Sequence, residues 1–256
     1  MNLINISLIQ TNLIWEDKNA NISNFDILLT RLSKCTDVIV LPEMFTTGFS
    51  MNSKALSESM DGETVNWMKS NAAKMEAIIT GSLIIEEDGN IFNRMIWAIP
   101  NGEIKYYDKK HLFTPSKENE FYQSGIKKLI VEYKGWKICP MICYDLRFPE
   151  WSRNKNEYDL LIYSANWPKA RSDHWRSLLK ARAIENQCYT VGVNRVGKDG
   201  NDLEYCGNTM AYDFGGNLLD EAIDIEKIIQ LNFEKEKLLK YRKKLPFLQD
   251  QEGMAS

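Results

Sequence analysis

The chain has 256 residues, of which 44% are hydrophobic and 26% are charged, values ordinary for a globular protein. A length near the upper limit of one hydrophobic core predicts a single domain over residues 1–256. The net charge of −3, from 32 basic and 35 acidic residues, argues against a nucleic-acid partner, because such proteins usually carry a basic excess or stripe.

The N-terminal stretch MNLINISLIQ has neither the basic start nor the long apolar segment of a signal peptide. No apolar run in the sequence approaches the ~20 residues that a membrane-spanning helix needs. We therefore expect a cytoplasmic location and no membrane partner. We also expect the last few residues to form a disordered tail.

The cysteines and histidines limit the kinds of site that the chain can build. The five cysteines are an odd number without framework spacing, which argues against a disulfide scaffold. The two histidines are His111 and His174, and no group of cysteines, histidines and carboxylates has the spacing of metal ligands. We therefore expect no metal site.

Hydrophobic periodicity predicts the elements of the first half of the chain. Apolar runs or alternation predict strands over residues 2–9, 37–41, 78–85, 91–99 and 103–109, and helical spacing predicts helices over 21–32 and 63–75. Turn signals at 88–90 and 100–102 join the last three of these strands into a meander.

The second half begins with a polar loop over residues 114–125, which contains Glu118 and Glu120. Periodicity then predicts strands over 129–133, 137–142, 158–164, 189–196, 204–213 and 217–222, and helices over 172–188 and 234–247. The first two of these strands form a hairpin around Lys134 and Gly135. Alternating strands and helices predict an α/β fold.

Four polar or reactive residues follow predicted strands: Glu43, Lys109, Cys143 and Asn166. Functional residues of α/β enzymes gather where strand ends share a sheet edge, so we expect these four to meet there. Taken alone, Cys143 is more often a small buried hydrophobe, and Glu43 is equally well a helix-cap or loop charge. Lys110 is interpreted as a solvated charge. Their shared position favours Cys143 as a nucleophile, which needs a base or a cation nearby.

Three motifs resemble those of the carbon-nitrogen hydrolase, or nitrilase, superfamily: LPEMFTTGF (41–49), YDKKHLF (107–113) and ICYDLRFPEW (142–151). The stretches NWPKAR (166–171) and ARAIENQCYTVGVNRVG (181–197) extend the resemblance over most of the chain. It implies a four-layer α-β-β-α sandwich that usually pairs into homodimers. It also implies a Glu-Lys-Cys triad and no metal or organic cofactor.

Carried onto this sequence, the triad is Glu43, Lys109 and Cys143. The second glutamate of the family matches Glu118 best, with Glu120 as the alternative. Glu43 is then the general base, and Cys143 forms a thioester with the substrate. Lys109 favours the thiolate and, with the backbone N–H of Tyr144, binds the developing oxyanion.

Within the superfamily, the sequence is most similar to the ω-amidase branch, which hydrolyses the terminal amide of α-keto acid amides such as 2-oxoglutaramate. A small anionic substrate of this kind needs a cationic partner. Arg171 is our candidate, because a guanidinium binds a carboxylate through two hydrogen bonds, and Asn166 and Trp167 line the same pocket. The alternative is that Arg171 is a solvated charge near the next helix.

Other functions stay open at this stage. An N-carbamoyl amide hydrolase or a true nitrilase would share the triad and differ in the pocket. A Cys-His peptidase using His111 is disfavoured, because the local signature of papain-like enzymes is absent. A non-catalytic binding protein on the same fold is a different class, and the intact triad argues against it.

Overall fold

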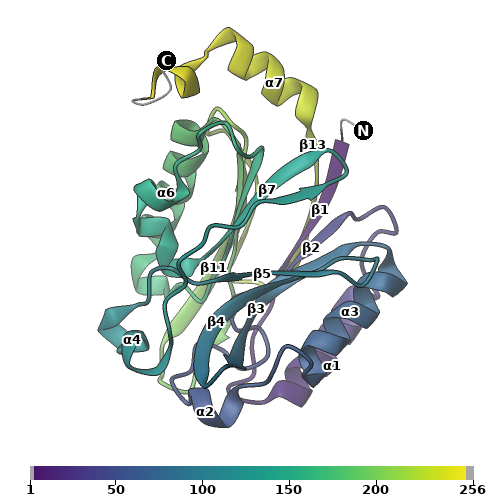
Figure 1. The fold of residues 1–256 in the computed structure, drawn as a ribbon, viewed down its shortest axis with the longest axis vertical. Helices are drawn as coiled ribbons and strands as arrows, with labels where there is room; N and C mark the ends of the chain where they lie inside the picture. Colours follow the sequence, from purple (N-terminus) through teal and green to yellow (C-terminus); the bar gives the residue numbers. More distant parts are fainter. Residues whose placement is uncertain (1–2, 252–256) are drawn as a thin grey trace.

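The computed structural model describes residues 3–251, so the tail predicted at the last few residues lies outside the described range. Two β-sheets pack face to face (Figure 1). Helices α1 (Lys18–Leu29) and α3 (Glu63–Met75) cover the outer face of one sheet, and α6 (Ser172–Asn186) covers the outer face of the other. The order of the layers is α-β-β-α, as the sequence predicted.

The first sheet has the strand order β13-β1-β2-β3-β4-β5. Strands β1, β2 and β3 are parallel, whereas β3, β4 and β5 form the predicted antiparallel meander. The bounds are β1 (Leu3–Gln10), β2 (Val38–Val40), β3 (Ile78–Glu87), β4 (Asn90–Ala98), β5 (Ile104–Asp108) and β13 (Lys227–Glu234).

The second sheet has the order β10-β11-β9-β8-β7-β6, and β12 pairs with β11. Strands β7, β8 and β9 are parallel to one another. The bounds are β6 (Val131–Tyr133), β7 (Trp136–Ile142), β8 (Leu160–Ser164), β9 (Tyr189–Val193), β10 (Val196–Lys198), β11 (Glu204–Tyr212) and β12 (Leu218–Ile223).

Several boundaries differ from the sequence prediction. Helix α1 begins at Lys18 because the Asp17 side chain accepts a hydrogen bond from the Ala20 N–H at 3.0 Å and caps the first turn. The strand expected over 189–196 divides into β9 and β10. The C-terminal helix α7 (Lys235–Lys244) is shorter than expected. Three short helices that the sequence did not predict also form: α2 (Ser53–Leu56), α4 (Glu118–Phe121) and α5 (Pro149–Ser152).

Strand β13 was missed by the sequence analysis. It pairs antiparallel with β1 along its whole length, and Ile229 and Phe233 are its fully buried side chains. Polar residues such as Gln230 and Asn232 interrupt the apolar run. An edge strand with so few buried positions has a weak periodic signal, since pairing with β1 rather than burial holds it in place.

The core lies between the sheets and beneath the helices that cover them. Between the sheets, side chains such as Trp97, Ile138 and Ile162 are fully buried. Beneath α1 and α3, Phe25 and Met68 pack against the outer face of the first sheet. Because central strands such as β2 are covered on both faces, they appear in the sequence as continuous apolar runs.

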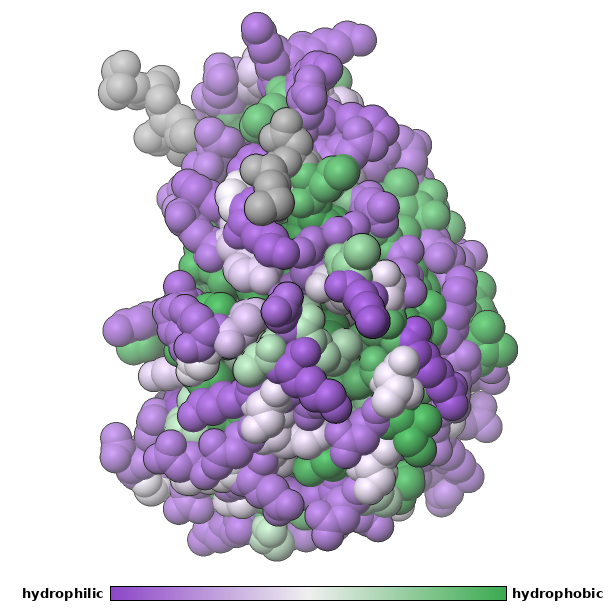
Figure 2. Space-filling view, turned by 90° about the vertical axis from the view of Figure 1, so that its right-hand side faces the viewer, coloured by the Kyte–Doolittle hydropathy of each residue, from purple (hydrophilic) through white to green (hydrophobic). Residues whose placement is uncertain are grey.

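Polar residues dominate the molecular surface seen from the side of α1 and α3 (Figure 2), with apolar side chains interspersed among them. Within residues 3–251, no helix has the length and apolar composition needed to cross a membrane.

Helix α6 approaches strand β9 closely at Gly192. A Cβ atom at this position would lie 2.5 Å from side-chain carbons of both Leu179 and Trp175. Those two residues are fully buried, and the Trp175 indole N–H donates to the Asn208 carbonyl at 2.7 Å. The helix therefore packs on the sheet at a distance that only glycine permits.

We predict that Gly192→Ala lowers the free energy of unfolding by about 1–3 kcal/mol, because the added methyl group overpacks this contact. Gly215→Ala is the matched control, since its nearest neighbours would lie at 3.4 Å, an ordinary contact distance. Urea unfolding of both variants measures the difference. Equal stability of the two variants would contradict the close contact of α6 with β9.

Candidate active site

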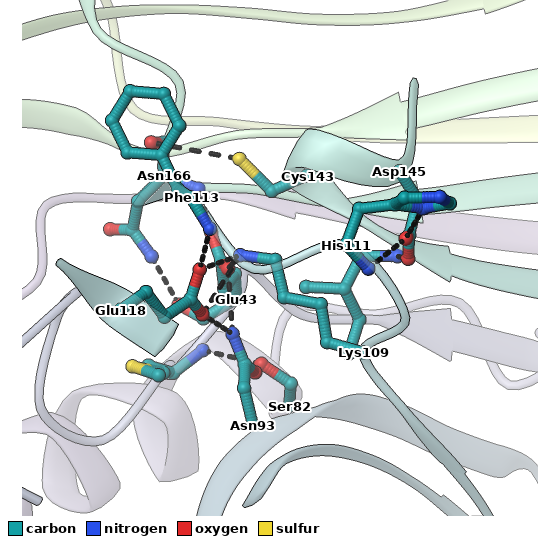
Figure 3. Close-up of polar contacts among 12 residues, drawn as sticks. Glu43, Ser82, Asn93, Lys109, His111, Phe113, Glu118, Cys143, Asp145 and Asn166 are labelled. Atoms are coloured by element: carbon teal, nitrogen blue, oxygen red, sulfur yellow. Dashed lines mark hydrogen bonds and ion pairs between the residues drawn. The ribbon is translucent and has the colours of Figure 1, made fainter. Parts of the chain in front are cut away.

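The four strand-end residues meet in one site (Figure 3), but they come from two sheets. Glu43 and Lys109 follow β2 and β5 of the first sheet, and Cys143 and Asn166 follow β7 and β8 of the second. The expectation of a common sheet edge was therefore wrong. The facing sheets end together, and the Ser164 hydroxyl bridges them by donating to the Leu41 carbonyl at 2.8 Å.

Glu43 is fully buried, and its carboxylate is held from three directions. It accepts hydrogen bonds from Asn93 Nδ2 at 2.8 Å, Lys109 Nζ at 2.9 Å and the Asn166 N–H at 2.8 Å. The next residue, Met44, has a φ of +42°, and its N–H donates to Ser82 Oγ at 2.8 Å. These bonds fix the carboxylate and compensate the cost of burying its charge.

Lys109 lies between two glutamates. Its Nζ is 2.9 Å from Glu43 Oε1 and 3.0 Å from both carboxylate oxygens of Glu118, and all three side chains are fully buried. Burial alone would lower the pKa of Lys109, but the carboxylates of Glu118 and Glu43 outweigh it and raise that pKa above its ordinary value. The lysine is therefore a fixed positive charge.

Glu118 rather than Glu120 faces the lysine. Glu118 begins α4 inside the segment that was expected to be a loop, and its Oε2 also accepts the Phe113 N–H at 2.5 Å. Burial raises the pKa of Glu118, and Lys109 opposes part of that rise. Glu120 is exposed and lies 3.8 Å from Lys117. Lys110, the residue after Lys109, does not join the cluster of Lys109 with the two glutamates. Its ammonium lies 5.6 Å from the Trp151 ring centre.

Cys143 directly follows β7 and opens a 3₁₀ turn, Cys143–Arg147, with a φ of +41°. This left-handed conformation is strained for a residue with a side chain and turns the half-buried thiol toward the pocket. Its Sγ lies 3.9 Å from the Asn166 carbonyl oxygen. The first N–H groups of the turn, including that of Tyr144, have no acceptor within it.

The pKa of the Cys143 thiol is raised well above its ordinary value. Burial is the largest cause and the Glu43 carboxylate the next, while Lys109 acts in the opposite direction. The lysine therefore favours the thiolate, as expected, but does not produce it alone. The thiol keeps its proton at neutral pH until a base removes it.

Asp145 braces the turn that carries Cys143, a role that the sequence analysis missed. One carboxylate oxygen accepts from the His111 N–H at 2.9 Å and lies 2.8 Å from His111 Nδ1. The other accepts from the Ile142 N–H at 3.0 Å and the Tyr107 hydroxyl at 2.7 Å. Asp145 thus joins the Cys143 turn to the segment that carries Lys109.

A pocket of about 330 Å³ opens over these groups. The four residues predicted to bind substrate, Tyr144, Asn166, Trp167 and Arg171, all line it. Its lining also includes Arg147, Phe113 and Tyr205, which the sequence analysis missed.

The missed residues left partial signals in the sequence. Asp145 and Arg147 stand two and four residues after Cys143, inside the same motif. Asn93 is a polar residue at a fully buried position of β4, and its Nδ2 reaches both Glu43 and Glu118, at 2.8 and 3.2 Å. A buried amide in an apolar strand indicates a partner that only the folded chain reveals.

Neither histidine forms a dyad with the thiol. His111 Nδ1 is bonded to Asp145, and its ring stacks on Phe148 with centres 3.8 Å apart. No hydrogen bond between residues 3 and 251 joins a histidine to Cys143. The same part of the chain contains no group of three or more histidine, cysteine or acidic side chains arranged to hold a metal ion.

The sequence profile of the carbon-nitrogen hydrolase family matches residues 5–242, and the chain belongs to this family. It is 45% identical to the Omega-amidase YafV of Escherichia coli (strain K12) over 249 residues, covering 96% of both proteins. It is 34% identical to the 2-oxoglutaramate amidase of Bacillus subtilis (strain 168) over 250 residues, again covering 96% of both.

Solved structures agree with this assignment. A CN-hydrolase superfamily protein from Xanthomonas campestris, with an arsenic adduct in its active site, matches with a TM-score of 0.95, 41% identity and full coverage of both chains. A branch 10 member of the nitrilase superfamily from Saccharomyces cerevisiae matches with a TM-score of 0.85 and 25% identity, covering 96% of this chain and 95% of that one. The predicted nitrilase-type sandwich is confirmed.

We predict that Asp145→Asn lowers the free energy of unfolding by about 1–3 kcal/mol, because the new amide N–H₂ faces groups that already donate. The matched control is Asp88→Asn on an exposed hairpin turn, where the φ of +50° suits asparagine. Thermal or urea unfolding measures both. If the two substitutions cost the same, Asp145 does not brace the turn.

Proposed function

We propose that this protein is an ω-amidase, which hydrolyses the terminal carboxamide of a short α-keto acid such as 2-oxoglutaramate to the acid and ammonia. The observation that carries the proposal is the thiol of Cys143 beside the buried Glu43, Lys109 and Glu118 cluster, at the base of a pocket. Relatives named for this activity match over nearly the whole chain.

The first half of the reaction forms a thioester. Glu43 takes the proton from Cys143 as Sγ attacks the amide carbon, and the carbonyl oxygen becomes an oxyanion. The Lys109 charge and the N–H of Tyr144 stabilise that oxyanion. Glu43 returns the proton to the amide nitrogen, the C–N bond breaks, and ammonia leaves.

The second half releases the acid. Glu43 removes a proton from a water molecule that attacks the thioester carbon, and the C–S bond breaks as the thiol of Cys143 regains a proton. Glu118 holds Lys109 through both steps, since its two oxygens lie 3.0 Å from Nζ. Because the thiol pKa is raised, the transfer to Glu43 occurs together with attack rather than before it.

The pocket size supports a small substrate. A cavity of about 330 Å³ is near the lower end of the usual range for ligand sites. Arg171 lines it, with its guanidinium carbon 5.5 Å from the Phe113 ring centre, and is the proposed partner of the substrate carboxylate. Asn166 and Trp167 line the same space.

Three expectations from the sequence stay predictions: one domain over residues 1–256, a homodimer, and a cytoplasmic location. The alternative chemistries, hydrolysis of an N-carbamoyl compound or a nitrile, would use the same four groups and differ in the substrate.

Ammonia release from a panel of 2-oxoglutaramate, glutamine, an N-carbamoyl amino acid and a simple nitrile tests the function. We expect 2-oxoglutaramate to have the highest kcat/KM, and glutamine to be poor because its α-ammonium meets cations in the pocket. Cys143→Ala should fold and show no turnover, because it cannot form the thioester. A preference for the nitrile or the carbamoyl compound would favour the corresponding alternative function. Turnover by Cys143→Ala would show that Cys143 is not the nucleophile.

The two adjacent lysines provide a second test. Lys109→Ala should lower kcat/KM by a factor of at least ~100, because loss of an oxyanion-stabilising group typically costs ~3–4 kcal/mol. Lys110→Ala should change it by less than a factor of ~3, as expected for a side chain outside the cluster. Steady-state kinetics on 2-oxoglutaramate measure both variants. Similar kinetics of the two would contradict the role of Lys109.

A further inference from the structure

Two arginines line the pocket, Arg147 and Arg171. Neither forms an ion pair with a carboxylate anywhere in residues 3–251, whereas Arg94 and Arg176 do, with Asp108 and Glu221. Two half-buried guanidinium groups beside a cavity, both without a protein counterion, favour an anionic ligand.

Besides Glu43, the pocket lining contains one other acidic residue, Asp199, which does not serve as their counterion. Asp199 lines the pocket, but one of its oxygens accepts the N–H groups of Asn201 and Leu203 at 2.8 and 3.1 Å. The other accepts the Tyr205 hydroxyl at 2.8 Å. The Asp199 oxygens therefore bond to the turn that Asp199 begins and to Tyr205, and among residues 3–251 no ion pair joins Asp199 to Arg147 or Arg171.

Arg147 is held in place by its neighbours. It ends the 3₁₀ turn that Cys143 begins, and its guanidinium carbon lies 4.9 Å from the Trp167 ring centre. One of its nitrogens donates to His174 Nδ1 at 3.1 Å. Stacking on a ring occupies a face of the guanidinium and leaves the N–H groups at its edge able to bind an anion.

The same indole connects the two arginines. The Trp167 indole N–H donates to the Arg171 backbone carbonyl oxygen at 2.7 Å, and the Arg147 guanidinium lies over the Trp167 ring. Arg171 in turn lies beside the Phe113 ring. Both residues thus contact Trp167, and both line the same pocket.

The charges also give the pocket a direction. Near Cys143, Glu43 and Lys109 line the pocket and Glu118 is buried against Lys109, so two carboxylates face a single ammonium. A substrate carboxylate is repelled by the excess negative charge near Cys143 and attracted by the two arginines. The uncharged amide end of the substrate is then the end that reaches Cys143.

We propose that Arg147 is a second anion-binding residue, which acts with Arg171 on the acid group of the substrate and so sets the preference for an acid amide over a neutral amide of the same length. This inference rests on the proposed amidase function and deepens it.

The test compares an acid amide with a neutral amide of the same length, 2-oxoglutaramate and pentanamide. Arg147→Met should lower kcat/KM for 2-oxoglutaramate ~10- to 100-fold, mainly through KM, because it removes charge-assisted hydrogen bonds made with the bound acid. It should change kcat/KM for pentanamide by less than ~3-fold. Arg147→Lys, which keeps the charge, should recover part of the loss.

The control for a general loss of positive charge is Lys169→Met. This residue belongs to the same turn as Arg171, but it is 53% exposed and pairs with Glu204 at 3.5 Å. It should change neither substrate by more than ~2-fold. Binding of 2-oxoglutaramate to Cys143→Ala, with and without Arg147→Met, measures affinity by calorimetry without turnover, and should show the same 10- to 100-fold loss.

Equal losses on both substrates would give Arg147 a structural role and overturn the inference, and so would an unchanged preference for the acid. If the wild-type protein releases no ammonia from 2-oxoglutaramate, the proposed function fails by itself. Glutarate, a short dicarboxylate, then decides the inference: weaker binding to Arg147→Met than to wild type supports an anion site, and equal binding overturns it.

Discussion

The buried ion cluster of Glu43, Lys109 and Glu118 is the constraint on which the site depends. Burying any one of these charges alone would cost several kcal/mol, and the cost is offset only because each faces an opposite charge and further hydrogen bonds. The three residues come from the loop after β2, the end of β5 and helix α4. The attraction of Lys109 to both glutamates therefore holds the segment after β5 against the loop after β2.

The thiol of Cys143 lies at the end of a strand of the opposite sheet and is linked to this cluster through Asn166. The N–H of Asn166 donates to the Glu43 carboxylate, and its carbonyl oxygen lies near Cys143 Sγ. Burial and the neighbouring carboxylate raise the pKa of the thiol, so a thiolate at Cys143 requires a base that takes its proton. A thiol that stays protonated until a base takes its proton suits chemistry in which acid and base act on a single bound amide.

Much of this could be predicted from the sequence. The apolar runs of β2, β7 and β8 mark central strands because these are buried on both faces, and helical spacing marks α3 and α6 because each buries one face against a sheet. The residues at the strand ends, Glu43, Lys109 and Cys143, were identified because each stands inside a local motif. Short motifs survive as sequence signals because the backbone around a reactive group tolerates few alternatives.

Tertiary structure decided what depends on contacts between distant segments. Periodicity reports how deeply a residue is buried but not which sheet its strand joins, so the meeting of Glu43 and Asn166, 123 residues apart, was placed on one sheet edge instead of between two. The sequence matched Glu118 best and kept Glu120 as the alternative, and only the fold of α4 shows that Glu118 is the one that faces Lys109. Strand β13 exists through its pairing with β1. From the sequence, we therefore obtained the family and the candidate catalytic residues, whereas the pocket and its charges required the packing of one sheet against the other.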